Sequence, residues 1–191
     1  MAKKRVGVLA LQGDYEAHIR AVRAAGGEGF EVRSAEELAT ADALILPGGE
    51  STTMGHLLKR FGLDIAIAEF HGAGKPIWGT CAGMILLAQR ITEGEKRGGQ
   101  PLLKLMDIAV ARNAFGRQID SFEADIETAL GRVHGVFIRA PYVSEWAPEV
   151  EVLARYEDRV VLVRQGNLLA SAFHPELTDD TTLHRAFLES A

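Results

Sequence analysis

Short apolar runs in the first half of the chain alternate with stretches of helical periodicity, and glycine-containing turns join several of them. Apolar runs of this length are typical of buried strands, and their alternation with amphipathic helices predicts a parallel sheet with helices on both faces. The expected strands are 5–11, 43–49 and 76–80, and the expected helices are 14–26, 54–61 with a cap at Ser51, Thr52 or Thr53, 63–74, and 82–90.

The pattern changes after about residue 92, where a polar loop at 92–101 begins. Alternating runs joined by short turns follow it, and they predict antiparallel strands added to the same sheet. These runs are 105–112, 121–127, 135–141, 150–156, 159–166 and 168–174, and a helix at 179–190 closes the chain. No linker or internal repeat interrupts the pattern, so we expect one domain over 1–191. The predicted fold class is α/β, with a mostly parallel central sheet and antiparallel additions in the C-terminal half.

Composition narrows the range of functions. Of 191 residues, 47% are hydrophobic and the net charge is -5, with no cluster of Lys and Arg beyond residues 3–5. Nucleic acid is therefore not an expected partner, and a small neutral or polar metabolite fits better. No apolar run approaches the roughly 20 residues that cross a bilayer, and no signal-peptide pattern is present, so we expect a cytoplasmic protein without membrane contact.

The chain has a single cysteine, Cys81, in the sequence Gly-Thr-Cys-Ala-Gly at a predicted strand-to-helix junction. This is the nucleophile-elbow pattern with sulfur in place of oxygen. The flanking glycines allow a sharp turn and close helix packing, which would expose the thiol at the carboxyl end of a strand. The helix N-terminus favours a thiolate, and the amide of Ala82 would face an oxyanion beside it. The alternative is a small buried apolar residue.

A nucleophilic cysteine needs a base, and the base needs an orienting partner. His18, His56, His71 and His184 lie in amphipathic helical stretches, so we expect them to face solvent. His174 differs because it ends an apolar run and precedes Pro175 and Glu176. In extended geometry residues i and i+2 face the same side, so Glu176 could hold Nδ1 of His174 and leave Nε2 toward Cys81.

Other interpretations of these residues remain open. His174 to Glu176 could form an ordinary surface turn. Cys81, His174 and Glu176 could instead bind zinc, although their spacing matches no familiar zinc signature.

A second glycine turn follows the strand at 43–49 and reads Pro-Gly-Gly-Glu-Ser. It lacks the spacing and the lysine of a phosphate-binding loop. Its expected position at the same sheet edge as Cys81 would bring backbone amides and the Ser51 hydroxyl beside the thiol. This arrangement suits a small zwitterion, although an ordinary turn and helix cap is the simpler alternative.

With these motifs the sequence resembles the class I, triad-type glutamine amidotransferases, and within that class the glutaminase subunits of pyridoxal 5'-phosphate synthases. The resemblance extends over about 5–190 and depends on the order and spacing of LQGDYEAH, LILPGGESTTM, GTCAGMILLA, RNAFGRQIDSFEADI, GVFIRAP and FHPELTDD. It implies a flavodoxin-like three-layer α/β/α sandwich.

The resemblance also implies roles for individual residues. The implied nucleophile, base and orienting acid are Cys81, His174 and Glu176. The implied glutamine contacts are Gly49, Glu50, Ser51, Arg112, Ile138 and Arg139. The implied oxyanion hole consists of the amides of Gly49 and Ala82. No cofactor and no metal is expected. Two departures from the family pattern are Ala114, where serine is more usual, and the long loop at 92–101.

The implied reaction is hydrolysis of L-glutamine to glutamate and ammonia through a glutamyl thioester. The implied partner is a (β/α)8-barrel pyridoxal 5'-phosphate synthase subunit, in a ring of synthases that carries glutaminases. Two alternatives stay open: the glutaminase subunit of imidazole glycerol phosphate synthase, and a non-enzymatic ThiJ/PfpI-like chaperone or stress protein.

Overall fold

The computed structural model describes residues 2–94, 98–112 and 121–191. Residues 113–120 of the motif RNAFGRQIDSFEADI, which include Ala114, lie outside the described residues, and so do 95–97 of the polar loop.

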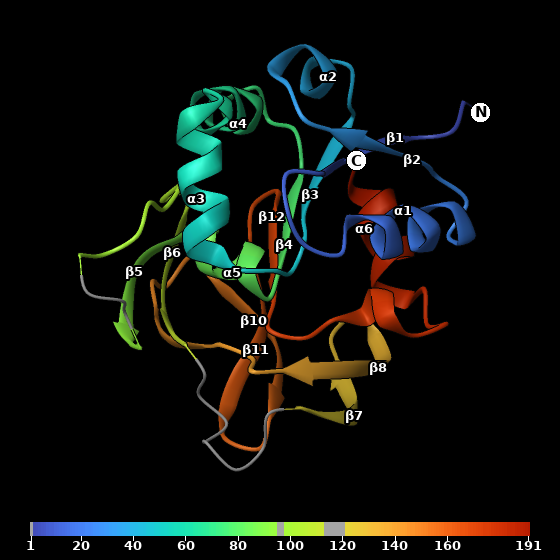
Figure 1. Ribbon diagram of the computed structural model, residues 1–191. Helices are drawn as coiled ribbons and strands as arrows, with labels where there is room; N and C mark the ends of the chain where they lie inside the picture. The colour runs from blue at the N-terminus through green and yellow to red at the C-terminus, as the bar shows by residue number, and fades with distance from the viewer. Residues whose placement is uncertain (1, 95–97, 113–120) are drawn as a thin grey trace.

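A ten-stranded mixed sheet forms the centre of the molecule (Figure 1). In spatial order its main path is β2 (Glu28–Val32), β1 (Arg5–Leu9), β3 (Ala43–Leu46), β4 (Ile77–Thr80), β12 (Leu168–Ser171), β11 (Arg159–Gln165), β9 (Tyr142–Trp146), β6 (Met106–Ala111) and β5 (Ala88–Glu93), and β10 (Glu151–Tyr156) pairs with β11. The first five strands of this path are parallel, whereas β9, β10 and β12 pair antiparallel with β11. The order β2-β1-β3-β4-β12 is the flavodoxin-like order, so the expected fold class is confirmed.

Helices cover both faces of the parallel strands. The helices are α1 (Tyr15–Ala24), α2 (Ala35–Ala39), α3 (Ser51–Arg60), α4 (Leu63–Gly72), α5 (Ala82–Leu87), the 3-10 turn η1 (Pro175–Leu177) and α6 (Thr182–Ser190). In Figure 1, α1 and α6 lie on one side of β1, β3 and β4, and α3, α4 and α5 lie on the other. The three layers close around fully buried side chains such as Trp78, Ile45 and Phe173.

The parallel strands end together at one edge of the sheet. Leu46 of β3 pairs with Gly79 of β4, and Thr80 of β4 pairs with Ser171 of β12. Because the strands are in this register, the glycine turn after β3, Cys81 after β4 and His174 after β12 emerge side by side. Ligands of open parallel sheets bind at such an edge.

Several sequence-based predictions about the elements were wrong or incomplete. The helix predicted at 82–90 ends at Leu87, because the backbone becomes extended at Ala88, where β5 begins to pair with β6. The amides of Leu103 and Leu105 donate hydrogen bonds to the carbonyls of Leu86 and Leu87. A longer helix would have needed these two carbonyls for its own hydrogen bonds. Strands β2, β5 and β9 and helix α2 were not predicted. A capping box between Ser34 and Glu37 is the signal that could have revealed α2.

Two strands of the C-terminal half do not join the central sheet, contrary to expectation. Within the described residues, β7 (Ser121–Thr128) and β8 (Gly131–Ile138) form a separate two-stranded sheet. A β-bridge between Val136 and His174 connects this hairpin to the segment that follows β12. The hairpin therefore supports the candidate base from outside the main sheet.

The cap of α3 also differs from the prediction. The side chain of Glu50 accepts hydrogen bonds from the amides of Thr52 (3.3 Å) and Thr53 (2.8 Å), so Glu50 is the N-cap and the helix begins at Ser51. A carboxylate at this position satisfies amides that the helix leaves unpaired. The hydroxyl of Ser51 is then free for contacts outside the helix.

Candidate active site

Cys81 lies in a sharp turn between β4 and α5. Its backbone has φ 50° and ψ -102°, a conformation that residues other than glycine rarely adopt. The Cys81 amide donates to the carbonyl of Ser171 at 2.8 Å, and the Cys81 carbonyl accepts from Ile85 at 3.2 Å. Strained backbone of this kind persists where the surroundings hold it, and it is common at reactive residues.

Both flanking glycines are sterically required, as the sequence suggested. A Cβ atom on Gly79 would lie 2.5 Å from the carbonyl carbon of Gly83, and one on Gly83 would lie 2.1 Å from the carbonyl oxygen of Leu46. Any side chain at either position would push the helix away from the strand ends. The glycines therefore allow α5 to pack directly behind the thiol.

His174 and Glu176 lie at the end of β12. The His174 amide donates to the carbonyl of Val136 at 2.8 Å, which fixes its backbone against β8. Nδ1 of His174 lies 2.8 Å from Oε1 of Glu176. The two residues meet across the 3-10 turn η1, not along the extended backbone that the sequence suggested. Pro175 begins that turn, so the chain bends and brings the carboxylate back to the ring.

The electrostatics of this pair favour a charged imidazole. Burial disfavours the charged form of His174, but the contacts with Cys81 and Glu176 outweigh it and raise the pKa of His174 to about 10. Burial likewise disfavours the Glu176 carboxylate, and the neighbouring histidines His18 and His174 overcome this and lower its pKa. Because Glu176 engages Nδ1, Nε2 is the ring nitrogen that remains for the sulfur.

A cleft of about 550 Å³ opens over the thiol, and Cys81, Ala82 and His174 line it. Every glutamine contact expected from the sequence lines the same cleft: Gly49, Glu50, Ser51, Arg112, Ile138 and Arg139. Glu176 does not line it, because it is buried behind His174. The cleft therefore brings the expected contact residues together from strand ends that are distant in sequence.

The glycine turn after β3 forms one wall of this cleft. Gly49 has φ 153°, a value that favours glycine, and a side chain there would meet the carboxamide of Gln12. Oε1 of Gln12 accepts from the amide of Glu50 at 2.9 Å, which holds the turn in place. Gln12 lies in the sequence motif used for the resemblance, but nothing in the sequence alone indicated this contact.

Sequence reasoning missed Gln100. Its Oε1 accepts from Nη1 of Arg112 at 2.8 Å and from the hydroxyl of Ser51 at 3.1 Å. Nη2 of Arg112 lies 3.5 Å from Oε1 of Glu50. Gln100 thus connects α3 to Arg112, behind the expected glutamine contacts. The only signal in the sequence was the unusual length of the loop at 92–101.

The expectation that His18 and His184 face solvent was wrong. Both side chains are buried, whereas His56 is exposed and His71 is half-buried. Nε2 of His18 lies 3.4 Å from Oε2 of Glu176, so α1 supplies a histidine directly behind the candidate orienting acid. The amphipathic pattern of α1 was correct, but its buried face contacts a polar cluster as well as the apolar core.

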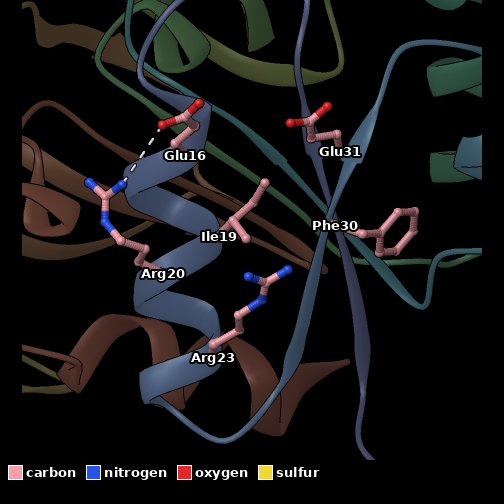
Figure 2. A pocket seen from close by; sticks show the side chains of 6 residues that line it. All are labelled: Glu16, Ile19, Arg20, Arg23, Phe30 and Glu31. Carbon is pink, nitrogen blue, oxygen red and sulfur yellow. Dashed lines mark ion pairs between the residues drawn. The ribbon is translucent and has the colours of Figure 1, made fainter.

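A second hollow, of about 500 Å³, lies between α1 and β2 (Figure 2). Figure 2 shows Glu16, Arg20 and Arg23 on the helix and Phe30 and Glu31 on the strand, with an ion pair of 4.0 Å between Glu16 and Arg20. None of the site residues expected from the sequence lines this hollow. The cleft at Cys81 is therefore the candidate active site.

Within 2–94, 98–112 and 121–191, no group of three or more His, Cys, Asp or Glu side chains could hold a metal ion. In the same part of the chain, no helix is long and apolar enough to cross a membrane.

The fold, with a cysteine elbow at the carboxyl edge of its sheet, is that of a glutamine amidotransferase. A crystal structure titled as a glutamine amidotransferase is 51% identical, covers 97% of each chain and has a TM-score of 0.91. The sequence matches the SNO glutamine amidotransferase family over residues 8–191. The chain belongs to this family.

Curated relatives cover nearly the whole chain. One from Parafrankia sp. (strain EAN1pec), named "Pyridoxal 5'-phosphate synthase subunit PdxT", is 55% identical over 99% of this chain and 94% of the relative. A protein of the same name from Pelotomaculum thermopropionicum is 53% identical over 97% of this chain and 94% of the relative.

Proposed function

We propose that this chain is the glutaminase subunit of a pyridoxal 5'-phosphate synthase, and that it supplies ammonia from L-glutamine for vitamin B6 biosynthesis. The names of the full-length relatives support the synthase, and family membership supports the glutaminase activity. The observation that carries the chemistry is that the strained Cys81 lines the same cleft as His174, whose ring is held by Glu176. The family match favours this assignment over an imidazole glycerol phosphate synthase subunit or a ThiJ/PfpI-like protein.

In the proposed first half-reaction, the Cys81 thiolate attacks the side-chain amide carbon of glutamine. A carbon–sulfur bond forms, and the amides of Gly49 and Ala82 stabilise the negative oxygen of the tetrahedral intermediate. His174 then gives its proton to the departing nitrogen, the carbon–nitrogen bond breaks, and ammonia leaves. A glutamyl thioester on Cys81 remains.

In the second half-reaction, neutral His174 takes a proton from water as the water oxygen attacks the thioester carbon. The carbon–sulfur bond breaks, glutamate leaves, and Cys81 and His174 return to the thiolate and imidazolium pair. Glu176 stays ionised throughout and stabilises the imidazolium. The raised pKa of His174 and the lowered pKa of Glu176 are consistent with these roles.

The expected contact residues suit the backbone end of glutamine. Arg112 offers a guanidinium for a carboxylate, and Glu50 offers a carboxylate for an ammonium group. Both line the cleft beside Ser51. We place the α-carboxylate and α-amino groups of glutamine there, with its side-chain amide toward Cys81.

We propose that all of 1–191 forms one glutaminase domain, since buried residues from Val6 to Phe187 belong to one cluster. Its partner is a (β/α)8-barrel synthase subunit that uses the ammonia, in a ring assembly with the glutaminases. A free thiol that would stay reduced is compatible with a cytoplasmic location.

The test is glutamate formation from L-glutamine, measured with the chain alone and with the barrel subunit added. We expect glutamine hydrolysis to depend on Cys81 and its rate to rise when the barrel subunit is added. A Cys81→Ala variant should lose hydrolysis but still bind the barrel subunit. Hydrolysis that survives in Cys81→Ala would reject the mechanism, and failure to bind the barrel subunit would reject the assignment to this synthase.

A further inference from the structure

A buried pair of histidines lies behind Glu176 and takes no part in the mechanism described above. His18 comes from α1 and His184 from α6, and both are no more than 1% exposed. Nδ1 of His18 lies 3.1 Å from Nε2 of His184. On its other side, Nε2 of His18 lies 3.0 Å from Oγ1 of Thr80 and 3.4 Å from Oε2 of Glu176. The two rings thus extend the line from Cys81 through His174 and Glu176 into the core.

The second oxygen of Glu176 depends on this pair. Oε1 contacts His174, whereas Oε2 is fully buried and has no hydrogen-bond donor among the residues the structure describes. Nε2 of His18 lies 3.4 Å from this oxygen and is hydrogen-bonded to Oγ1 of Thr80. A buried carboxylate oxygen without a donor is costly, so an N–H at this position matters for the charge state of Glu176.

The positions of the protons follow from which atoms have partners. If His18 carries its proton on Nε2, that N–H donates to Oγ1 of Thr80 and lies beside Oε2 of Glu176, and Nδ1 accepts from Nε2–H of His184. If His18 carries the proton on Nδ1, its Nε2 accepts from the Thr80 hydroxyl with a lone pair 3.4 Å from Oε2 of Glu176, and His184 must hold its proton on Nδ1. Nδ1 of His184 is buried and has no partner in the described part of the chain. The second arrangement therefore leaves an unpaired buried N–H and a repulsive contact.

The surrounding charges are compatible with a neutral pair. Burial lowers the pKa of His18 despite the opposing effects of Glu176 and Asp14, and the charge on His174 lowers it further. Burial and His18 lower the pKa of His184 to about 3, against Glu176 and Asp180. Neutral imidazoles can each carry one fixed proton, and this is what a directional contact requires.

We propose that His18 is a positioning residue for Glu176: its Nε2–H, whose hydrogen-bond partner is Oγ1 of Thr80, lies 3.4 Å from Oε2 and attracts this oxygen electrostatically so that Oε1 faces His174, and His184 fixes the tautomer of His18. This inference rests on the proposed role of Glu176 as the orienting acid. In the described residues Oε2 has no hydrogen-bond donor, so loss of the His18 N–H removes the electrostatic attraction at 3.4 Å, and the carboxylate either turns away from His174 or takes up a proton. Either change removes negative charge from Nδ1 of His174 and weakens the imidazolium that faces Cys81.

The tautomers can be observed directly in the intact chain. With 15N-labelled histidine, NMR of the folded protein near pH 7 should show His18 and His184 neutral and protonated on Nε2. Single substitutions of each histidine assign the signals. A proton on Nδ1 of His18, or a charged His18, would overturn the proposal whether or not the protein hydrolyses glutamine.

The kinetic test compares two substitutions of His18, measured as glutamine hydrolysis in the complex with the barrel subunit. His18→Phe keeps an aromatic ring but removes the donor, and it should lower kcat by about 10- to 100-fold with little change in KM, as for loss of an outer partner of a functional histidine. His18→Gln can place an N–H near the position of Nε2 and should recover most of kcat. His56→Gln, at an exposed site on α3, is the control and should match wild type.

Alkylation of Cys81 by iodoacetamide provides a readout that needs neither substrate nor partner. Because Cys81 is the only cysteine, the alkylation rate at pH 7 reports its thiolate and the neighbouring imidazolium. His18→Phe should slow alkylation and His18→Gln should restore it, while circular dichroism shows that both variants are folded. Equal rates in folded His18→Phe and wild type would overturn the positioning role. If alkylation follows this pattern but wild type releases no glutamate, the proposed function fails and the positioning role stands.

Discussion

Gly48 lies directly against the imidazole of His174. A Cβ atom on Gly48 would be 2.2 Å from Cε1 and 2.9 Å from Nδ1 of that ring. Gly48 is not among the glycines with positive φ, so alanine fits the backbone and only the contact with His174 forbids it. The glycine turn therefore sets the position of the candidate base as well as one wall of the cleft.

Gly48→Ala should displace the His174 ring from the line between Cys81 and Glu176. A misplacement of about 1 Å can cost roughly 100-fold in rate, so we expect kcat for glutamine hydrolysis to fall at least that far. Gly72→Ala is the matched control. Gly72 ends α4, and apart from its own helix no atom lies within 4 Å of a Cβ added there, so the variant should keep wild-type activity. Wild-type kcat in a folded Gly48→Ala variant would show that the ring can move without penalty.

Glu176→Gln should lower kcat by about 10⁴-fold with a smaller effect on KM. The amide has nearly the same shape but no charge, and it can offer an N–H to Nδ1 of His174, which favours the wrong tautomer. Steady-state kinetics of the complex measure the change. A fall of less than tenfold would mean that Glu176 does not orient the base.

Gln100→Leu should raise KM for glutamine by about tenfold and leave kcat nearly unchanged. The substitution removes the acceptor that holds Arg112 and Ser51, and a hydrogen bond to a charged group contributes about 1.5–3 kcal/mol. A higher KM at an unchanged kcat indicates that substrate binding is lost. Gln89→Leu serves as control, because Gln89 bonds the carbonyl of Lys104 and does not line the cleft. A selective loss of kcat in Gln100→Leu would contradict a binding role.

His184 should make the fold sensitive to acid. Its pKa is lowered from 6.5 to about 3 in the folded chain because burial disfavours its charged form. The unfolded chain therefore binds the proton more readily, so the contribution to stability is complete above pH 6.5 and is lost as the pH falls toward 3. In His184→Phe, Tm should fall less steeply than in wild type between pH 6.5 and pH 4. His56→Gln should keep the wild-type slope, and parallel curves for His184→Phe and wild type would refute the assignment.

Local patterns predicted the parts of the site that depend on neighbouring residues. The Cys81 elbow needs two glycines within a few positions, and the contact between His174 and Glu176 spans two residues, so both could be found in the sequence. The register of β3, β4 and β12 then follows from parallel pairing, which aligns strand ends at one edge.

Contacts between distant segments could not be predicted in this way. The amphipathic pattern of α1 placed His18 on a helix but did not show that its ring would meet Thr80 and Glu176, 62 and 158 positions away. The contact of Gln100 with Arg112 and Ser51 joins segments 12 and 49 positions apart, and the polar sequence around Gln100 carries no periodic signal.

Short-range patterns were enough to predict the alternation of strands and helices, the sharp turn at Cys81 and the residue types expected to act in catalysis. Backbone conformation and side-chain type depend on a few neighbouring residues, so these features could be predicted from short stretches of sequence. The folded chain was needed to show that His18 and His184 are buried behind Glu176, that the β7–β8 hairpin stays separate, and that α5 ends at Leu87. Each of those outcomes depends on which surfaces pack together, and packing joins residues that no short-range pattern relates.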